Sequence, residues 1–215
     1  MLTLYYSPGA CSLAPHAALV ATGAEHRLVL VNVRAGQQLA PDYAAVAPRQ
    51  RVPALATPQG VLTEVIAILL FLDRLNPDAR LLPDGAYARG KAIEWLAWFA
   101  STVHPLYRAY WRSAWFADDE RAHPALRETG KRRILDAMRE LDLAVAGRTA
   151  LVGERLGAVD DYAAVFARWT FDTFPTEAAP LAALREYLAR VGARPAFATA
   201  LAREGIVLLP EQVAA

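Results

Sequence analysis

The sequence predicts two domains, an α/β domain with a small mixed sheet followed by an all-α domain. Over residues 1–76, short apolar runs rich in β-branched side chains alternate with helical patterns in the order β-α-β, then β-β-α. Residues 77–86 contain the Pro, Asp and Gly residues typical of a linker. From residue 87 to residue 215 the apolar spacing is helical almost throughout, which predicts an all-helical domain.

The first domain is expected to contain four strands. A helix follows the first strand at once, because Pro15 suits a first helical turn and Gly23 suits a helix stop. Two strands separated by a helix form a parallel β-α-β unit, and a Pro-Gln-Gly turn joins the last two strands as a hairpin. The expected strands cover residues 2–6, 26–33, 52–57 and 61–62, with a helical turn at 41–46 and a helix at 63–76.

The second domain is expected to consist of several amphipathic helices. Apolar residues recur at helical spacing over residues 92–103 and 134–145, the latter run including Leu143. Further helices are expected at residues 159–171, 181–191 and 195–202.

Eight aromatic residues are expected within one long helical segment of the second domain. Many would be core or subunit contacts, and some would line an apolar pocket beside Cys11. They are Trp95, Trp98, Phe99, Tyr107, Tyr110, Trp111, Trp115 and Phe116.

Cys11 is the only cysteine and lies at or just before the N-terminus of the first helix. The unpaired N–H groups and the helix dipole favour an anion there, so a thiolate with a lowered pKa is expected. The alternative is a small buried residue that only packs. Because the chain has no second cysteine, any redox chemistry must use the thiol of a small molecule such as glutathione.

Pro53 opens the third strand, and its position after a lone cysteine and a β-α-β unit resembles the thioredoxin-like fold. A proline here is expected to be cis, which would leave the backbone of Val52 free to pair with a bound peptide. The alternative is an ordinary trans proline at a strand entrance.

Composition argues against several classes of partner. The net charge is +1, so neither nucleic acid nor an anionic membrane is expected as a partner. The longest apolar run, residues 65–72, is shorter than the roughly 20 residues that span a bilayer, and with no visible leader a cytoplasmic protein is expected. The histidines His16, His26 and His123 lack metal-ligand spacing, so no metal is expected.

Five stretches carry the most specific motifs of the chain. The first is the run Tyr-Tyr-Ser-Pro-Gly-Ala-Cys-Ser-Leu-Ala-Pro-His at residues 5–16, and the others are residues 48–55, 62–64, 94–104 and 151–160. In these stretches the chain resembles the cytosolic glutathione transferases, and among them the bacterial beta class. The resemblance implies a homodimeric detoxification enzyme that uses glutathione as co-substrate and an apolar electrophile as second substrate.

The resemblance also implies where glutathione binds. The backbone of Val52, before Pro53, would pair with the cysteinyl backbone of the tripeptide, and Glu64 would hold its ammonium group. Val65 stands where the family has a serine, but its backbone N–H at a helix N-terminus can still receive a carboxylate.

Other positions depart from the family pattern. Gly36 stands in place of a lysine, Ala97 in place of an asparagine, and Pro105 in place of a second lysine. Losing several hydrogen bonds would weaken glutathione binding by about tenfold to a thousandfold. Arg51 or Arg34 would replace part of the lost positive charge.

His104 is the second candidate for catalysis. The resemblance places it opposite the thiol across the cleft between the domains, where it would donate a hydrogen bond or act as a general acid near neutral pH. The alternative is a helix histidine that Pro105 turns outward.

Asp160 resembles the buried helix-capping aspartate of the family. The partner in the capping box, usually Ser or Thr, is Gly157 here. An incomplete capping box is therefore expected.

Two functions fit the residues. In the first, which we take as the prediction, Cys11 either hydrogen-bonds a glutathione thiolate that attacks an electrophile, or forms a mixed disulfide with glutathione. In the second, the chain is a non-catalytic protein of the same fold that binds an apolar ligand or a protein partner. The departures at Gly36, Val65, Ala97 and Pro105 support this second function.

Overall fold

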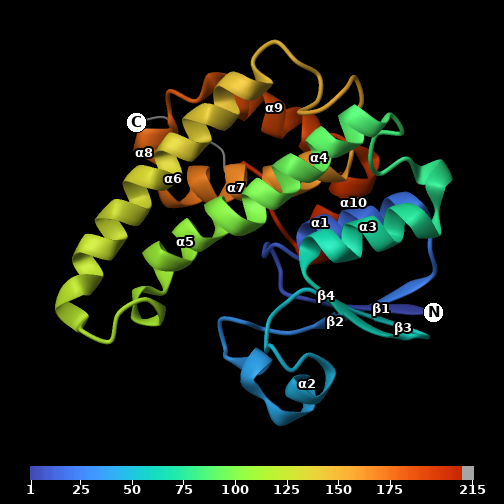
Figure 1. Ribbon diagram of the computed structural model, residues 1–215, viewed down its shortest axis with the longest axis horizontal. Coiled ribbons are helices and arrows are strands. Elements are labelled where there is room, and N and C mark those ends of the chain that lie inside the picture. Colours follow the sequence, from blue (N-terminus) through green and yellow to red (C-terminus); the bar gives the residue numbers. More distant parts are fainter. Residues whose placement is uncertain (210–215) are drawn as a thin grey trace.

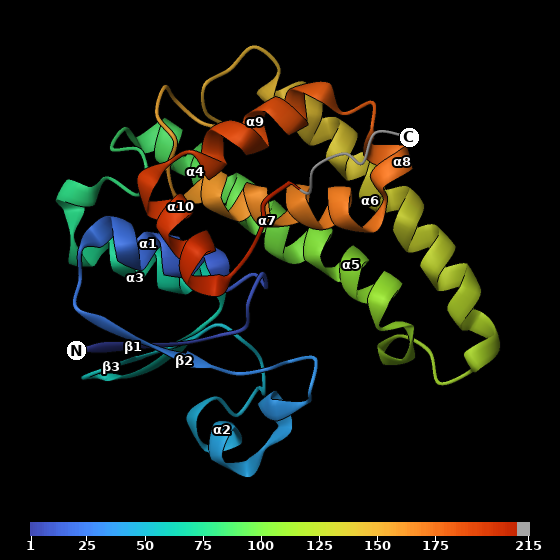
Figure 2. The same ribbon diagram turned by 180° about the vertical axis from the view of Figure 1, so that it is seen from behind.

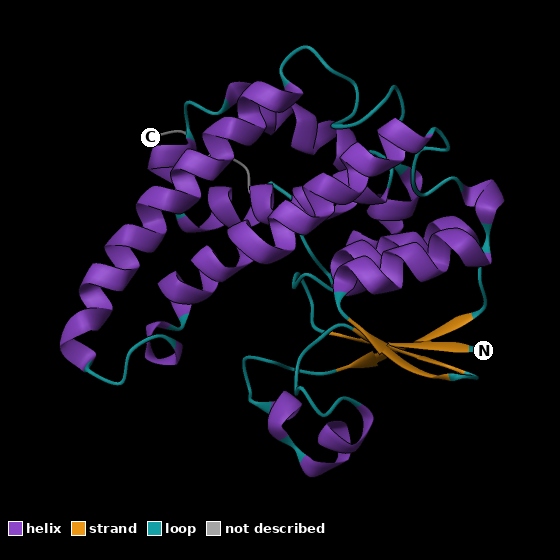
Figure 3. Ribbon diagram, viewed as in Figure 1, coloured by secondary structure: helices purple, strands orange, loops and turns teal. Residues whose placement is uncertain are grey.

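The computed structural model describes residues 1–209, which form a small mixed sheet beside a larger group of helices (Figure 1, Figure 3). The sheet order is β2-β1-β3-β4, with β1 and β2 parallel and the other neighbours antiparallel. This arrangement confirms the expected thioredoxin-like fold. Its elements are β1 (Leu2–Tyr6), α1 (Leu13–Thr22), β2 (His26–Leu30), α2 (Pro41–Val46), β3 (Ala54–Thr57), β4 (Gly60–Thr63) and α3 (Val65–Leu75).

Helices cover the two central strands, β1 and β3, on both faces, whereas β2 and β4 have no buried residue. Leu4 and Leu55, which are paired in register on β1 and β3, are fully buried in the same core as α1 and α3 (Figure 1). On the other face, Tyr43 of α2 packs against Tyr5 with ring centroids 5.7 Å apart. Helices on both faces explain why these short strands are largely apolar.

Two strands are shorter than expected. β2 ends earlier, although the Val31 N–H still donates to the Tyr6 carbonyl at 2.7 Å. β3 begins only at Ala54, since Pro53 has no N–H to contribute to a ladder. The peptide bond between Val52 and Pro53 is cis, which confirms the expectation for this proline.

The chain from residue 86 onward is largely helical. The central helix is α7 (Ala158–Thr173), whose residues 158–167 are all buried; other helices surround it, and it also contacts α1 (Figure 2). Within the described residues, no helix is long and apolar enough to cross a membrane. The other helices are α4 (Ala86–Trp98), α5 (His104–Trp111), α6 (His123–Val145), α8 (Pro175–Ala178), α9 (Ala182–Gly192) and α10 (Pro195–Glu204).

The aromatic segment is helical without a break from residue 86 to residue 111, a range that holds six of the eight aromatic residues. Trp115 lies in a separate 3₁₀ turn and Phe116 follows it. Residues 99–103 form a wider π-helical turn between α4 and α5, and α5 ends at Trp111. Pro105 lies just after that turn, and its missing N–H and bulky ring disfavour regular α-helical bonding to the preceding residues. Leu143 was also expected on an apolar face, but 77% of its surface is exposed.

The start of α7 has the expected incomplete capping box. Asp160 accepts the Gly157 N–H at 2.7 Å, the Leu151 N–H at 2.8 Å and the Tyr187 hydroxyl at 2.6 Å. A Cβ atom at Gly157 would lie 2.6 Å from the Leu81 carbonyl oxygen. This close approach explains why glycine replaces the Ser or Thr of a complete box.

Candidate active site

A cavity of about 300 Å³ lies between the sheet-containing part of the chain and α5. Its walls come from the loop before α1, the segment before β3, the start of α3 and the start of α5. Every residue that the sequence analysis assigned to the site lines this cavity. These residues are Cys11, Arg51, Val52, Pro53, Glu64, Val65 and His104.

Cys11 lies in a well-ordered loop between β1 and α1. The Ser12 hydroxyl accepts the Ser7 N–H at 3.2 Å and donates to the Ser7 carbonyl at 3.1 Å, which closes the loop. The Cys11 Sγ lies 3.5 Å from the Val52 carbonyl oxygen and donates to it. The thiol is therefore tied to the segment that precedes the cis proline.

The prediction that the helix N-terminus lowers the pKa of Cys11 is wrong. Burial raises the pKa of the thiol to about 12, because the side chain is only 6% exposed and a thiolate would lose its water. Hydrogen bonds from backbone N–H groups and the charge of Arg108 oppose this effect without cancelling it, and the charge of Glu64 adds to it. Cys11 is a protonated thiol at neutral pH.

His104 faces the cavity and is not turned outward. Its ring packs against Phe166 and Trp169, with centroids 5.9 and 5.6 Å away. Burial, followed by the charges of Arg108 and Arg51, lowers the pKa of the imidazole to about 4. The prediction that His104 acts as a general acid near neutral pH is therefore wrong. The neutral ring can still donate one hydrogen bond.

Glu64 occupies the rim of the cavity with an uncommon backbone conformation, φ 69°. Its carboxylate lies 3.9 Å from Arg49 Nη1, and both side chains are about two-thirds exposed, at 66% and 68%. Exposed ion pairs of this kind are weak. The carboxylate can thus exchange Arg49 for another cation, such as an ammonium group.

The departures from the family pattern fall into two pairs. Val65 and Pro105 line the cavity, whereas Gly36 and Ala97 do not. Of the two cations expected to compensate, Arg51 lines the cavity and Arg34 lines a neighbouring one beside the loop of residues 7–10.

Three residues of this region were missed by the sequence analysis. Arg108 lines the cavity one helical turn after His104, and this four-residue spacing was a signal that could have revealed it. No sequence pattern distinguished Arg49, which also lines the cavity, or Trp169, which packs on His104.

A second cavity of about 240 Å³ adjoins the first. The two share five lining residues, among them Cys11 and His104. Three tryptophans, Trp111, Trp115 and Trp169, also line the second cavity. Trp111 and Trp115 are among the eight expected aromatic residues, so some of those residues do line a pocket beside the thiol, although arginines line it as well.

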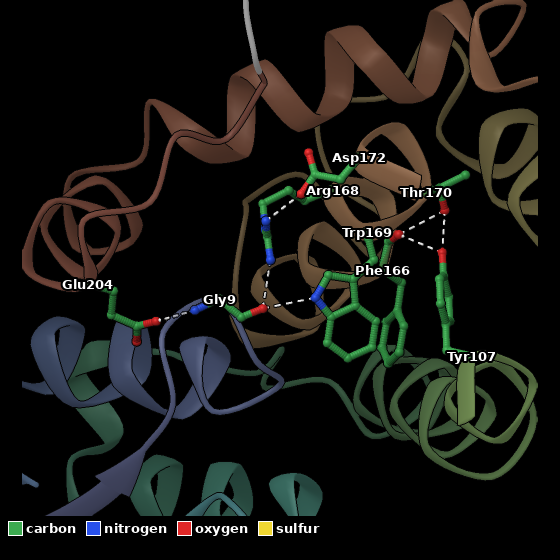
Figure 4. A network of polar contacts seen from close by, with 8 residues as sticks. All are labelled: Gly9, Tyr107, Phe166, Arg168, Trp169, Thr170, Asp172 and Glu204. Atoms are coloured by element: carbon green, nitrogen blue, oxygen red, sulfur yellow. Dashed lines mark hydrogen bonds and ion pairs between the residues drawn. The ribbon is translucent and has the colours of Figure 1, made fainter. Parts of the chain in front are cut away.

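The loop before Cys11 is held at both polar atoms of Gly9 (Figure 4). The Gly9 N–H donates to Glu204 Oε2 at 2.8 Å, and the Gly9 carbonyl accepts hydrogen bonds from Arg168 Nη2 at 2.7 Å and Trp169 Nε1 at 2.9 Å. Glu204 also contacts His16 Nδ1 at 2.8 Å. Side chains of α7 and α10 therefore fix the loop that carries the thiol.

The fold and site together define a class of protein. Within residues 1–209, no group of three or more His, Cys, Asp or Glu side chains could hold a metal ion. A thioredoxin-like sheet, a large helical part and a cavity that contains a cysteine and a cis proline are the architecture of the cytosolic glutathione transferases.

Comparisons with known proteins agree with this class. Residues 1–74 match the family model described as the glutathione S-transferase N-terminal domain. Over 208 residues the chain is 30% identical to glutathione S-transferase GstA of Escherichia coli O157:H7, a match that covers 95% of this chain and 100% of that protein. The chain belongs to the glutathione S-transferase family.

Solved structures place it near the bacterial beta class. The beta class glutathione S-transferase of Sphingomonas chungbukensis is 31% identical, with a TM-score of 0.82. A sphingomonad glutathione S-transferase complexed with glutathione is 30% identical, with a TM-score of 0.81. Each match covers 95% of this chain and 100% of the other chain.

Proposed function

We propose that this protein is a glutathione transferase that conjugates glutathione to an apolar electrophile. One observation carries the proposal: a single cavity gathers Cys11, the Val52–Pro53 segment, Glu64 and His104 from distant parts of the chain. A relative crystallised with glutathione supports the choice of co-substrate.

In this proposal, glutathione lies along the edge of the sheet. The backbone of Val52 pairs with the cysteinyl backbone of the tripeptide, and Glu64 exchanges Arg49 for the γ-glutamyl ammonium group. The N–H of Val65, at the first residue of α3, receives the γ-glutamyl carboxylate. Arg51 supplies positive charge to the same cavity.

The protonated state of Cys11 favours conjugation over disulfide chemistry. A mixed disulfide requires a thiolate, and the pKa of this thiol is raised to about 12. The thiol instead exchanges the Val52 carbonyl for the glutathione thiolate as its hydrogen-bond acceptor, and the neutral His104 donates to the same thiolate. The thiolate forms a bond to the electrophilic carbon, the leaving group departs with its electron pair, and the thiol proton passes to water.

Calorimetric titration of glutathione into the wild type and Val65→Ser tests the binding step. Saturation of the wild type at or below millimolar concentration supports the enzyme, and tighter binding by Val65→Ser would follow from one restored hydrogen bond. Cys11→Ser and Cys11→Ala, assayed side by side, then test catalysis. Cys11→Ser should retain more activity than Cys11→Ala, because a hydroxyl can donate a hydrogen bond and a methyl group cannot. Equal activity of the wild type and both variants would remove Cys11 from the mechanism.

A second candidate function is a non-catalytic protein of the same fold that binds an apolar ligand or protein partner. The apolar side chain of Val65 and the ring of Pro105 in the cavity favour it. Binding of an apolar ligand without any saturation by glutathione would support this function and exclude the transferase.

The proposal also covers the domain boundaries, the oligomeric state and the localisation of the enzyme. We propose that residues 1–76 form the glutathione-binding domain, residues 77–86 the linker and residues 87–215 the helical domain, of which residues 210–215 lie outside the described part. We also propose a homodimer that acts in detoxification in the cytoplasm, without nucleic acid, membrane or metal. Light scattering of the purified protein tests the dimer.

A further inference from the structure

Three arginines and no acidic residue line the second cavity. The arginines are Arg51, Arg108 and Arg112. Within residues 1–209, none of their guanidinium groups forms an ion pair with a carboxylate. Three arginines with no carboxylate among the lining residues make this cavity a region of positive charge.

Two of these cations contact the same aromatic ring. The guanidinium carbons of Arg51 and Arg108 lie 5.6 and 5.2 Å from the centroid of the same Trp115 ring. Burial and the charge of Arg51 together lower the pKa of Arg108. An anion bound between or beside these groups would remove that repulsion.

The rest of the cavity suits a flat aromatic ligand. The rings of Trp111 and Trp169 meet edge to face, with centroids 5.1 Å apart, and Trp115 lies on the same cavity at 62% exposure. Gln38 also lines the cavity, and its side-chain oxygen is buried without a hydrogen-bond partner among the described residues. The cavity therefore combines aromatic walls, one unpaired hydrogen-bond acceptor and positive charge.

We propose that the second substrate is an aromatic electrophile that carries a carboxylate or a similar anionic group. Its ring packs among the three tryptophans, and its anion pairs with Arg112 and Arg108. Arg51 and Arg108 border both cavities, whereas Arg112 lines the second and not the first. Arg112 is therefore the arginine whose substitution separates binding in the second cavity from glutathione binding in the first. That the bound compound reacts rests on the proposed transferase function. That the cavity binds an aromatic anion does not depend on that function.

The test compares two ring compounds that cannot react because they have no leaving group. Calorimetry measures the affinity of the protein for 3,5-dinitrobenzoate and for the neutral 3,5-dinitrobenzamide. Both titrations are done in low salt, with and without saturating glutathione. We expect the wild type to bind the carboxylate about tenfold more tightly, as one charged hydrogen bond allows. The preference should fall to about threefold or less in Arg112→Gln, and should also weaken in high salt.

Arg132→Gln is the matched control, because Arg132 is an exposed arginine of α6 outside both cavities. It should keep the full preference. Equal affinity for the two compounds, binding of neither, or an undiminished preference in Arg112→Gln would overturn the inference.

Turnover separates this inference from the proposed function. With glutathione and 4-chloro-3,5-dinitrobenzoate, the sulfur replaces chlorine on the ring, chloride leaves with the bonding electrons and the proton passes to water. A preference for the carboxylate without any turnover supports the anion site and counts against the transferase. Turnover of the matching carboxamide, without preference for the carboxylate, supports the transferase and refutes the anion site.

Discussion

Two parts of the site are held in place by different interactions. The loop that carries Cys11 is fixed by buried hydrogen bonds at Gly9, whereas the rim of the cavity around Arg49 and Glu64 has exposed side chains with one weak ion pair and one exposed hydrogen bond. Buried polar contacts are costly to break, and exposed pairs contribute little. The thiol thus keeps a constant position, while the rim can adjust to the charges of a ligand.

The largest effect is expected from removing the carboxylate that holds the loop. Glu204→Ala leaves the Gly9 N–H and His16 Nδ1 without their buried partner. We expect the free energy of unfolding to fall by about 3–5 kcal/mol, measured by urea denaturation. Glu186→Ala, an exposed glutamate of α9, should change it little. A loss below about 1 kcal/mol for Glu204→Ala would mean that the loop is not fixed as described.

The next effect concerns the reactivity of Cys11. Alkylation by iodoacetamide at pH 8 should be about a thousandfold slower in the folded protein than in urea, because a pKa of about 12 leaves almost no thiolate whereas an unfolded cysteine has a pKa of about 8.5. The rate in the folded protein should rise about tenfold for each pH unit, since deprotonation limits it. Equal rates in the folded and unfolded protein would show that the folded protein has an available thiolate, which would support the mixed-disulfide mechanism.

A smaller effect is expected from two matched glycine substitutions. Gly9 and Gly23 have φ angles of 67° and 63°, so alanine at either position costs about 1–2 kcal/mol of backbone energy. A Cβ at Gly9 would also lie 2.6 Å from Arg168 Nη2, whereas nothing lies within 4 Å of one at Gly23. Gly9→Ala should therefore lose roughly 1–3 kcal/mol more stability than Gly23→Ala. Equal losses in denaturant titrations would show that Arg168 moves aside freely.

The smallest effect is expected on the exposed rim. Arg49→Gln removes the 3.9 Å ion pair with Glu64 and the exposed 2.9 Å hydrogen bond from Arg49 Nη1 to Thr63 Oγ1. The melting temperature should change by less than about 4 °C, because exposed pairs contribute at most about 1 kcal/mol. A larger decrease in a calorimetric scan would mean that the rim is held as firmly as the loop that carries Cys11.

Local patterns determined most of the fold. Alternating and helical spacing located the four strands and the helices that cover them, and the order of Cys11 and Pro53 along the chain indicated the thioredoxin-like arrangement. These features depend on neighbouring residues, so the sequence carries them directly. The sequence failed where packing overrides spacing, as in the π-helical turn before Pro105 and at the exposed Leu143.

The chemistry of the site depended on tertiary structure. The sequence by itself located Cys11 and His104, but it assigned the thiol a lowered pKa and the imidazole a proton near neutral pH, and burial reverses both. Trp169 and Glu204, which hold the Gly9 loop, are separated from it by 160 and 195 positions. The cost of charging a buried group depends on everything packed around it, and only the folded chain brings those groups together.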